Sequence, residues 1–349
     1  MMESLFSRYR RIMNMRRLSE EFRCGYAFVG VGGHSMQNLY PVIDYLHVPL
    51  TYVCCRDRRK IPLIERRYRG VRATTELDEV LADDAVKGVF VSVGSQVHYD
   101  MARKVLSAGK SLFIEKPPCV TLRQLDCLSA VCRSASGVVS LVGMQKRYSS
   151  SVRLLRKRLA LLPPLSYRYV YATGRYPEGD PLLELFIHPL DLVCHLFGLP
   201  VVKGVQRMVS KDGELTLLLL LEHSGFSGIM ELSTNYSWLK PVDELSVNTA
   251  KGEFRVSGGE ALRYSPHGFS MLGVPLEKAF GGSVVQKTLF RSDGFTPTLV
   301  NNYVYTQGYF SEIKTFVTLV EGHRCRNLSS LPSLRATYCL IEEIRKRLI

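Results

Sequence analysis

The sequence has no apolar run long enough to cross a lipid bilayer. The longest such run, Leu215–Leu221, is about one third of the roughly 20 residues that a membrane-spanning helix needs, and Thr216 interrupts it. Residues 1–23 also lack the apolar stretch of a secretory signal. We therefore expect no contact with membranes. We expect residues 1–24 to form a basic N-terminal tail that is disordered or loosely docked, with an amphipathic basic leader as the alternative.

The cysteines lack the paired spacing that disulfide frameworks and thiolate zinc sites require. The chain has nine cysteines, an odd number, and no two of them form a Cys-x-x-Cys motif. Several lie in apolar runs, where cysteine behaves as a small hydrophobic residue. This usage is typical of a reducing compartment, so we expect a cytoplasmic protein and no metal site.

Acidic residues are scarce relative to basic ones. Lys and Arg number 46 against 32 Asp and Glu, so the net charge is +14 and the pI is near 9.4. Three segments, residues 1–23, 56–72 and 146–158, together carry +15, and the rest of the chain is about neutral. No RNA-binding aromatic motif, zinc-finger spacing or basic zipper accompanies them. We expect an anionic small molecule as the partner and no nucleic acid.

The hydrophobic pattern predicts two domains, the first α/β and the second α+β. Over residues 25–143 apolar runs alternate with helical patterns, as in the parallel sheet of a Rossmann dinucleotide-binding domain. Over residues 144–349 the strands are longer, which predicts a mostly antiparallel open sheet. The helices expected in this second domain cover residues 182–197, 308–321 and 331–348.

A glycine-rich turn follows the first expected strand, residues 26–31, and opens an expected helix over residues 35–46. This context matches a dinucleotide fingerprint, in which backbone amides approach a pyrophosphate at the helix N-terminus. Ser35 stands at the position of the third glycine. A glycine turn without a ligand is the alternative. The residues expected to contact the cofactor are Gly30, Gly32, Gly33, His34 and Ser35.

The second expected strand, Leu50–Cys55, ends without the carboxylate that accepts from the ribose 2′-hydroxyl of NAD. Arg56 follows Cys55 directly, and a guanidinium suits a 2′-phosphate through bidentate hydrogen bonds. The sequence therefore favours NADP over NAD, with Arg56 at the phosphate. Asp57 would reverse this preference if the register slips, and a solvated basic loop is a further alternative.

Three further motifs extend this pattern. They are residues 108–117, which end in Glu115-Lys116-Pro117, the segment Gly143-Met144-Gln145-Lys146-Arg147-Tyr148, and the segment Ile187-His188-Pro189-Leu190-Asp191. With the glycine turn, they resemble the glucose–fructose oxidoreductase/inositol dehydrogenase (Gfo/Idh/MocA) family over about residues 25 to 322. The resemblance implies a Rossmann domain followed by an α+β domain whose open sheet often forms oligomer contacts, here in a homodimer or homotetramer.

The resemblance also implies roles for individual residues. It places Lys116 at the nicotinamide and pairs His188 with an acidic residue four positions earlier, here Glu184 in place of the usual aspartate. Where relatives often have Thr-Pro-Asn, this chain has Val93-Gly94-Ser95, while His98 keeps its later position. The catalytic set implied is Lys116, His188 and Glu184, and the additional cofactor contacts are Ser95, His98, Glu115 and Lys116.

The sequence pattern also points to Glu184 and His188 without the family resemblance. Glu184, His188, Asp191 and His195 share one stripe of the expected helix over residues 182–197, among apolar neighbours. Buried ionisable groups need partners, so we expect Glu184 to orient the imidazole of His188 for acid/base work. Pro189 is expected to kink this helix. The alternatives are a structural polar network and a divalent metal held by Glu184, His188 and His195.

These features predict reversible hydride transfer between a nicotinamide and a carbinol or keto carbon of a sugar, cyclitol or related molecule. His188 would exchange the hydroxyl proton and Lys116 would bond the developing alkoxide. An anionic sugar-like substrate would find its contacts in Arg147, Tyr171, Arg175 and Asp191, with a solvated surface turn as the alternative. A non-catalytic dinucleotide sensor and a nicotinamide-dependent glycosidase are the competing functions.

Overall fold

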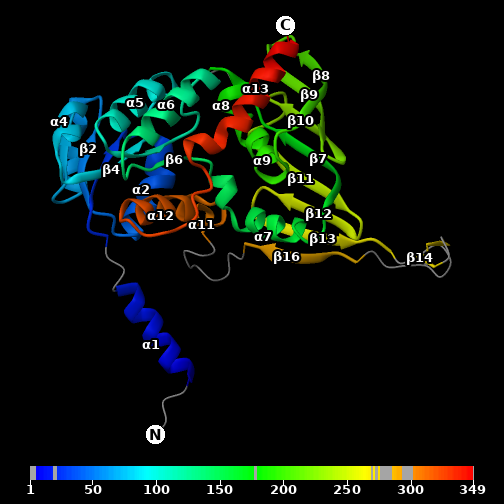
Figure 1. The fold of residues 1–349 in the computed structure, drawn as a ribbon, viewed down its shortest axis with the longest axis horizontal. Coiled ribbons are helices and arrows are strands. Elements are labelled where there is room, and N and C mark those ends of the chain that lie inside the picture. The colour runs from blue at the N-terminus through cyan, green and yellow to red at the C-terminus, as the bar shows by residue number, and fades with distance from the viewer. Residues whose placement is uncertain are drawn as a thin grey trace.

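Two β-sheets and the helices around them organise the chain (Figure 1). The computed structural model describes residues 5–18, 22–176, 179–268, 270–271, 274–275, 285–292 and 302–348. In this described part, no helix has the length and the apolar character needed to cross a membrane.

The first sheet is entirely parallel. Its strands run in the order β3-β2-β1-β4-β5-β6. Strand order reverses between β1 and β4, and the crevice at such a switch point is where open α/β sheets bind ligands. The predicted Rossmann fold is confirmed. The strands are β1 (Gly25–Val29), β2 (Leu50–Cys54), β3 (Arg72–Thr74), β4 (Val86–Val91), β5 (Ser111–Ile114) and β6 (Ser140–Val142).

Short helices connect these strands. The helix expected over residues 35–46 forms as a π-helical turn followed by an α-helix. Thr121 and Gln124 make a reciprocal capping box at the start of α6. The connecting elements are η1 (Ser35–Leu39), α2 (Tyr40–Tyr45), η2 (Arg58–Lys60), α3 (Ile61–Arg67), α4 (Leu77–Ala82), η3 (Ser95–Val97), α5 (His98–Ser107) and α6 (Leu122–Ser134).

The second sheet has eight strands in the order β16-β13-β12-β11-β7-β10-β9-β8. Only β7 and β10 pair in parallel, so the expected mostly antiparallel sheet is confirmed. A separate two-stranded ladder joins β14 (Ser270–Met271) to β15 (Val274–Pro275). The eight strands are β7 (Pro164–Ala172), β8 (Val201–Val209), β9 (Leu215–His223), β10 (Phe226–Ser233), β11 (Val242–Thr249), β12 (Gly252–Ser257), β13 (Ala261–Pro266) and β16 (Lys287–Arg291).

The longest apolar run of the sequence serves both faces of this sheet. Along β9, Leu217, Leu219 and Leu221 are buried, whereas Leu218 and Leu220 are 37% and 46% exposed. The alternation is that of a strand with one face in the core and one face open. The open face therefore carries apolar side chains that no helix of the described chain covers.

Helices on the inner face and at the junction complete the molecule. Helix α12 packs beneath the parallel sheet, where Ile313, Phe316 and Val317 join the core of β1, β4 and β5. Helix α13 packs against α6, α9 and β8, so it connects the two sheets' layers. These elements are η4 (Gln145–Tyr148), α7 (Ser150–Leu159), α8 (Pro181–Glu184), α9 (Ile187–Phe197), α11 (Tyr303–Thr306), α12 (Tyr309–Val320), η6 (Leu331–Leu334) and α13 (Arg335–Leu348).

The N-terminal segment forms a helix, α1 (Leu5–Leu18), where we expected a disordered or loosely docked tail. Its apolar side chains Leu5, Phe6 and Tyr9 are 87%, 61% and 58% exposed. Figure 1 shows α1 extending away from the two sheets. None of the described side chains of α1 joins either core.

Candidate active site

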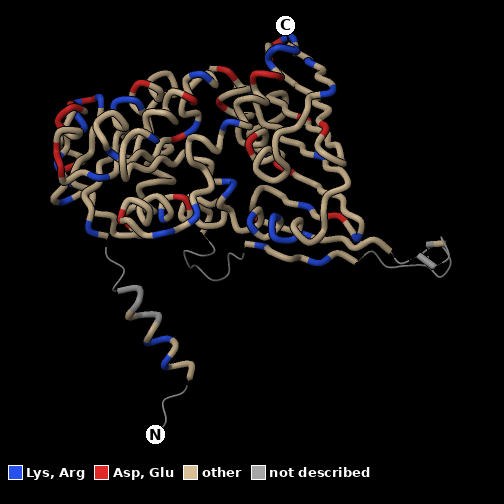
Figure 2. The backbone as a smooth tube through the Cα atoms, viewed as in Figure 1, with Lys and Arg blue, Asp and Glu red and all other residues tan. Residues whose placement is uncertain are grey.

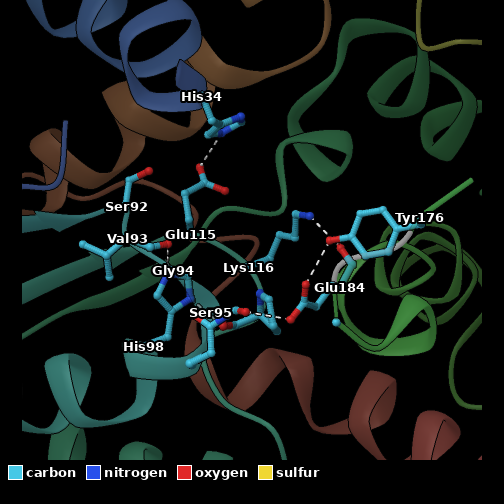
Figure 3. Close-up of a pocket in the computed structure, with 13 residues that line it drawn as sticks. His34, Ser92, Val93, Gly94, Ser95, His98, Glu115, Lys116, Tyr176 and Glu184 are labelled. Atoms are coloured by element: carbon cyan, nitrogen blue, oxygen red, sulfur yellow. Dashed lines mark hydrogen bonds and ion pairs between the residues drawn. The ribbon is translucent and has the colours of Figure 1, made fainter. Parts of the chain in front are cut away.

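A pocket of about 380 Å³ lies at the carboxyl edge of the parallel sheet, beyond β4 and β5. Tyr176, Gly179 and Glu184 close it on the opposite side, as Figure 3 shows for Tyr176 and Glu184. It brings together six predicted residues, namely His34, Ser95, His98, Glu115, Lys116 and Glu184. The other residues that line it are Ser92, Val93, Gly94, Gln96, Pro117, Tyr176 and Gly179.

The glycine turn leads directly into this pocket. Gly30 has φ of +113°, and a Cβ there would lie 1.9 Å from the carbonyl oxygen of Ser92, so no other residue fits. A Cβ on Gly32 or Gly33 would meet no heavy atom within 4 Å, so the face of the turn is open. Ser35 folds back to Gly32 through hydrogen bonds of 3.0 Å. An open turn at a helix start suits a pyrophosphate.

The end of β2 has no free carboxylate. Cys55 is buried, and Asp57 accepts hydrogen bonds from the backbone N–H of Arg59 at 3.0 Å and from its guanidinium Nη2 at 2.9 Å. These bonds lower the pKa of Asp57. Arg56 is exposed, and in the described chain no ion pair holds it. Lys60 donates to the carbonyl oxygen of Val31 at 3.0 Å, which ties this basic loop to the glycine turn.

His98 fixes the loop after β4 instead of facing the pocket with a free ring nitrogen. Its Nδ1 lies 2.7 Å from the carbonyl oxygen of Pro117, and its Nε2 lies 3.0 Å from that of Val93. A neutral imidazole donates to only one of these acceptors. Burial lowers the pKa of His98, against the opposing effect of the carbonyl at Pro117. His98 therefore positions the residues around it.

Lys116 and Glu184 form the centre of the pocket. Lys116 Nζ donates to the backbone carbonyl of Glu184 at 2.7 Å. The Glu184 carboxylate accepts from Ser95 Oγ at 2.7 Å and from Tyr176 OH at 2.9 Å, and Figure 3 shows these contacts. Burial lowers the pKa of Lys116, opposed by Glu115 and Glu184. A Cβ on Gly179 would lie 2.6 Å from this carboxylate, so a glycine is needed beside it.

Glu115 and Glu312 form an acidic pair beside the glycine turn. Glu115 Oε1 is 3.4 Å from His34 Nε2. Glu312, on α12, is fully buried and neither of its carboxylate oxygens has a hydrogen-bond partner among the described residues. Burial and then Glu115 raise the pKa of Glu312 well above its ordinary value. Sequence reasoning missed Glu312, because its burial depends on a helix that returns about 200 residues later to the parallel sheet.

His188 lies outside the helix that holds Glu184, contrary to the single helical stripe that we expected. Asp180 caps the one-turn helix α8, which ends at Glu184, and α9 starts anew at Ile187. Pro189 falls in the first turn of α9, where a missing N–H costs nothing, so it causes no kink there. In the described chain no hydrogen bond joins Glu184 to His188, because Ser95 and Tyr176 hold the carboxylate.

The electrostatic surroundings of His188 are cationic. Its Nδ1 is buried and has no hydrogen-bond partner within the described residues. Burial, Lys116, Lys146 and His34, in that order, lower the pKa of His188 well below its ordinary value. His188 is therefore a neutral imidazole close to Lys116, although it does not line the pocket.

Arg147 and Asp191 pair with each other inside the protein. They are 3% and 2% exposed, and Arg147 Nε donates to Asp191 Oδ2 at 2.7 Å. Arg147 Nη1 also donates to Ser333 Oγ at 2.9 Å, and Thr337 Oγ1 donates to Asp191 Oδ1 at 2.8 Å. Neither residue lines the pocket. The structure thus gives this predicted substrate pair a structural role, because each charge is already neutralised by the other.

The remaining predicted substrate residues also have partners elsewhere. Arg175 is exposed and its Nε lies 3.7 Å from Glu214 Oε1. The ring of Tyr171 lies 5.4 Å from Lys146 Nζ, and Lys146 pairs with Asp243. Sequence reasoning named Arg175 where its neighbour in the chain, Tyr176, reaches the pocket. Side chains alternate between two faces along an extended segment, and this alternation could have indicated that Arg175 and Tyr176 face opposite ways.

The alternative metal site does not assemble. Glu184 lines the candidate active site, whereas His195 lines a different pocket beside Arg147. Across the described ranges, no group of three or more His, Cys, Asp or Glu side chains is arranged to hold a metal ion.

Comparison with known proteins agrees with this geometry. Residues 24–143 match the model of the oxidoreductase family with an NAD-binding Rossmann fold, GFO_IDH_MocA. Over these residues the chain is therefore similar to the Gfo/Idh/MocA oxidoreductase family. The chain is 31% identical over 190 residues to the uncharacterized oxidoreductase YhhX of Escherichia coli. The aligned region is 50% of this chain and 54% of that protein.

A second relative is named scyllo-inositol 2-dehydrogenase (NADP(+)) IolW, from Bacillus subtilis. It is 26% identical over 168 residues, 44% of this chain and 47% of that protein. The chain thus spans about half the length of these two relatives. The fold extends further, since a dehydrogenase structure from Chromobacterium violaceum superposes with a TM-score of 0.78 at 20% identity, over 94% of this chain and 96% of that one.

Proposed function

We propose that the protein is an NAD(P)-dependent dehydrogenase or reductase acting on a hydroxyl or keto carbon of a sugar, cyclitol or related molecule. The observation that supports this most strongly is Lys116. It is a half-buried ammonium just beyond the end of β5, in the same pocket as the glycine-turn residue His34. The open backbone at Gly32 and Gly33 suits the cofactor phosphates. A nicotinamide bound here would supply the hydride donor or acceptor.

The chain's own residues supply the polar chemistry. Lys116 Nζ has donors beyond the one given to the Glu184 carbonyl, and we propose that one of them bonds the substrate oxygen. A lowered lysine pKa makes the ammonium a better proton donor near neutral pH. His188 is a neutral imidazole outside the pocket lining, and its lowered pKa makes it a weak proton acceptor, so we assign the proton exchange to Lys116. Glu184 acts as a positioning residue, because Ser95 and Tyr176 occupy its carboxylate.

A polyhydroxyl substrate without a negative charge fits this pocket best. The three predicted cationic or acidic substrate ligands Arg147, Asp191 and Arg175 have partners in the structure. An anion would find Lys116 as its cation in the lining set, and Glu115 and Glu184 lie beside it. We therefore propose a neutral sugar or cyclitol in place of the expected anionic one.

For the cofactor we propose NADP in preference to NAD. Support comes from exposed Arg56 and from Asp57, which turns to Arg59 and leaves no free carboxylate at the end of β2. A charge-assisted contact to a 2′-phosphate contributes about 1.5–3 kcal/mol, or roughly 10- to 100-fold in affinity. The family description names NAD and one relative is named for NADP(+), so direct titration has to distinguish them.

The test of this function is a panel of neutral and acidic sugars and cyclitols, with NADP+ and with NAD+, followed at 340 nm. We expect turnover with a neutral polyol. Lys116→Met should lower turnover by about 10²–10⁴-fold while NADPH still binds, as measured by fluorescence. Unchanged turnover in Lys116→Met rejects the role of Lys116. Cofactor binding without turnover on any substrate would favour the sensor, and release of free sugar from a glycoside would favour the glycosidase.

We also propose self-association through the open face of the eight-stranded sheet. Leu218, Leu220 and Ile229 are 37–50% exposed on this face. Exposed apolar patches on a sheet face are typical of protein interfaces. Light scattering after size-exclusion chromatography should show a dimer or tetramer, and Ile229→Lys should shift it toward the monomer. A monomer in the unmodified protein would contradict this assembly.

A further inference from the structure

A second pocket, of about 580 Å³, lies where η4, α7 and α12 meet. It shares no lining residue with the candidate active site. Its walls come from η4 and α7, from His195 near the end of α9, from α12, and from the segment that contains Arg326. Its volume is in the range of small-molecule sites. A ligand in this second pocket would bind independently of the proposed cofactor and substrate.

The lining of this second pocket is strongly basic. Arg147, Arg153, Arg156, Lys157 and Arg326 line it, and no Asp or Glu does. Asp191 neutralises Arg147. The other four cations form no ion pair with any carboxylate in the described part of the chain. The pocket therefore carries a net positive charge that no described carboxylate compensates.

Three of these cations share one face of a single helix. On α7, Arg153, Arg156 and Lys157 occupy positions i, i+3 and i+4, which brings their side chains together. Like charges at these spacings destabilise a helix. Figure 2 shows Lys and Arg gathered on α7, which has no acidic residue. Burial, Arg326 and Arg147 lower the pKa of Arg156, which is how uncompensated neighbours act on a cation.

The opposite wall is polar and rigidly held. Ser311 and Thr315 of α12 line it beside His195. His195 Nε2 is buried without a hydrogen-bond partner among the described residues. Burial and then Arg147 lower the pKa of His195 to about 4, so the ring is neutral and its tautomer is free to donate. Tyr148 OH accepts from the backbone N–H of Leu328 at 3.0 Å, which anchors the segment next to Arg326.

We propose that this pocket binds a small multivalent anion of the phosphate-ester or polyphosphate class, held by the guanidinium groups of Arg153, Arg156 and Arg326. Planar guanidinium groups bind phosphate oxygens in bidentate fashion. Ser311 and His195 are placed to supply neutral hydrogen bonds. The basic segment over residues 146–158, which the cofactor does not need, thereby acquires a ligand of its own. Five elements line the pocket, and its volume suits a small molecule.

The probe is inorganic pyrophosphate, with orthophosphate for comparison, titrated into the full-length protein by calorimetry at low and moderate salt. Pyrophosphate should bind with a stoichiometry of about one per chain, and more tightly than orthophosphate. Arg156→Ala and Arg326→Ala should each weaken pyrophosphate binding by about tenfold or more. Circular dichroism and the melting temperature show whether each variant is folded.

Two control variants separate this pocket from the other basic regions. Arg158→Ala removes the same charge from the same helix, but Arg158 does not line the pocket, so binding should change less than about twofold. Arg56→Ala removes a charge from the expected cofactor region, and it too should leave pyrophosphate binding unchanged. The absence of binding overturns the proposal. Equal weakening in Arg158→Ala would show a diffuse basic surface, and loss in Arg56→Ala alone would place the phosphate at the glycine turn. Either result overturns the proposal as well.

Discussion

Replacing Asp191 with alanine should destabilise the protein strongly, because the Arg147 guanidinium would stay buried without a counter-charge. The two side chains are 2% and 3% exposed and their charged atoms are 2.7 Å apart. Coulomb's law at about 4 Å between charge centres, with an effective dielectric constant of about 20, gives about 4 kcal/mol. Removing one partner of a buried pair typically costs about 3–5 kcal/mol. We expect the free energy of unfolding to fall by this amount.

The assay is urea unfolding followed by far-ultraviolet circular dichroism. The matched control is Glu222→Ala, which removes a carboxylate 2.7 Å from Lys203 in a pair that is about half exposed. This control should cost less than about 1 kcal/mol, since water screens the pair. The double variant Arg147→Met/Asp191→Leu should recover to within about 2 kcal/mol of the unmodified protein, because it leaves no buried charge.

Three results would refute this reasoning. An unchanged urea midpoint in Asp191→Ala would mean that Arg147 has water or another acceptor available and that the pair is not structural. A raised KM for substrate at undiminished stability would return Asp191 to the substrate site. A double variant as unstable as the single one would show that packing around the pair, and not its charge, supplies the stability.

Three further predictions concern the site. The fold raises the pKa of Glu312 above its ordinary 4.5, so the native state holds a proton that the unfolded state releases. The free energy of unfolding should therefore fall as the pH rises above 4.5, by up to about 1.4 kcal/mol per pH unit. Glu312→Gln should remove this slope in urea unfolding between about pH 5 and pH 8, and equal slopes would contradict it. Arg56→Ala should weaken NADPH binding about 10- to 100-fold with little change for NADH, by fluorescence titration. Gly30→Ala should lower the melting temperature and abolish cofactor binding, because its Cβ would overlap Ser92 at a φ of +113°; native-like binding would show that the turn adapts.

The sequence predicted those helices and strands whose apolar runs have clear boundaries. The strands expected over residues 26–31 and Leu50–Cys55 overlap β1 and β2, since a glycine turn ends the first run and Arg56 follows the second. β3, α3 and α4 were not predicted. β3 has three residues, and α3 buries only Ile64 within the basic segment, so neither shows a hydrophobic period.

The site was predicted to the extent that its motifs are contiguous. His34, Glu115 and Lys116 follow buried strands, and parallel strands bring their carboxyl ends to one edge whatever the rest of the chain does. Their partners were not predicted in this way. Ser95, Tyr176 and Glu184 meet only because Tyr176 and helix α8 pack against the loop that follows β4. The helical period that placed Glu184 and His188 on one stripe fails because Leu185 and Phe186 separate α8 from α9. The hydrophobic pattern does not show this break.

The sequence by itself determined the class of fold, the position of the glycine turn and the place of Lys116, because these follow from hydrophobic period and backbone conformation within short segments. The tertiary structure decided what each charge does. Arg147 is neutralised by Asp191, whereas Arg156, nine residues further on, faces a pocket without a carboxylate. Whether a charge is neutralised depends on which distant segment packs against it, and that is a property of the assembled fold.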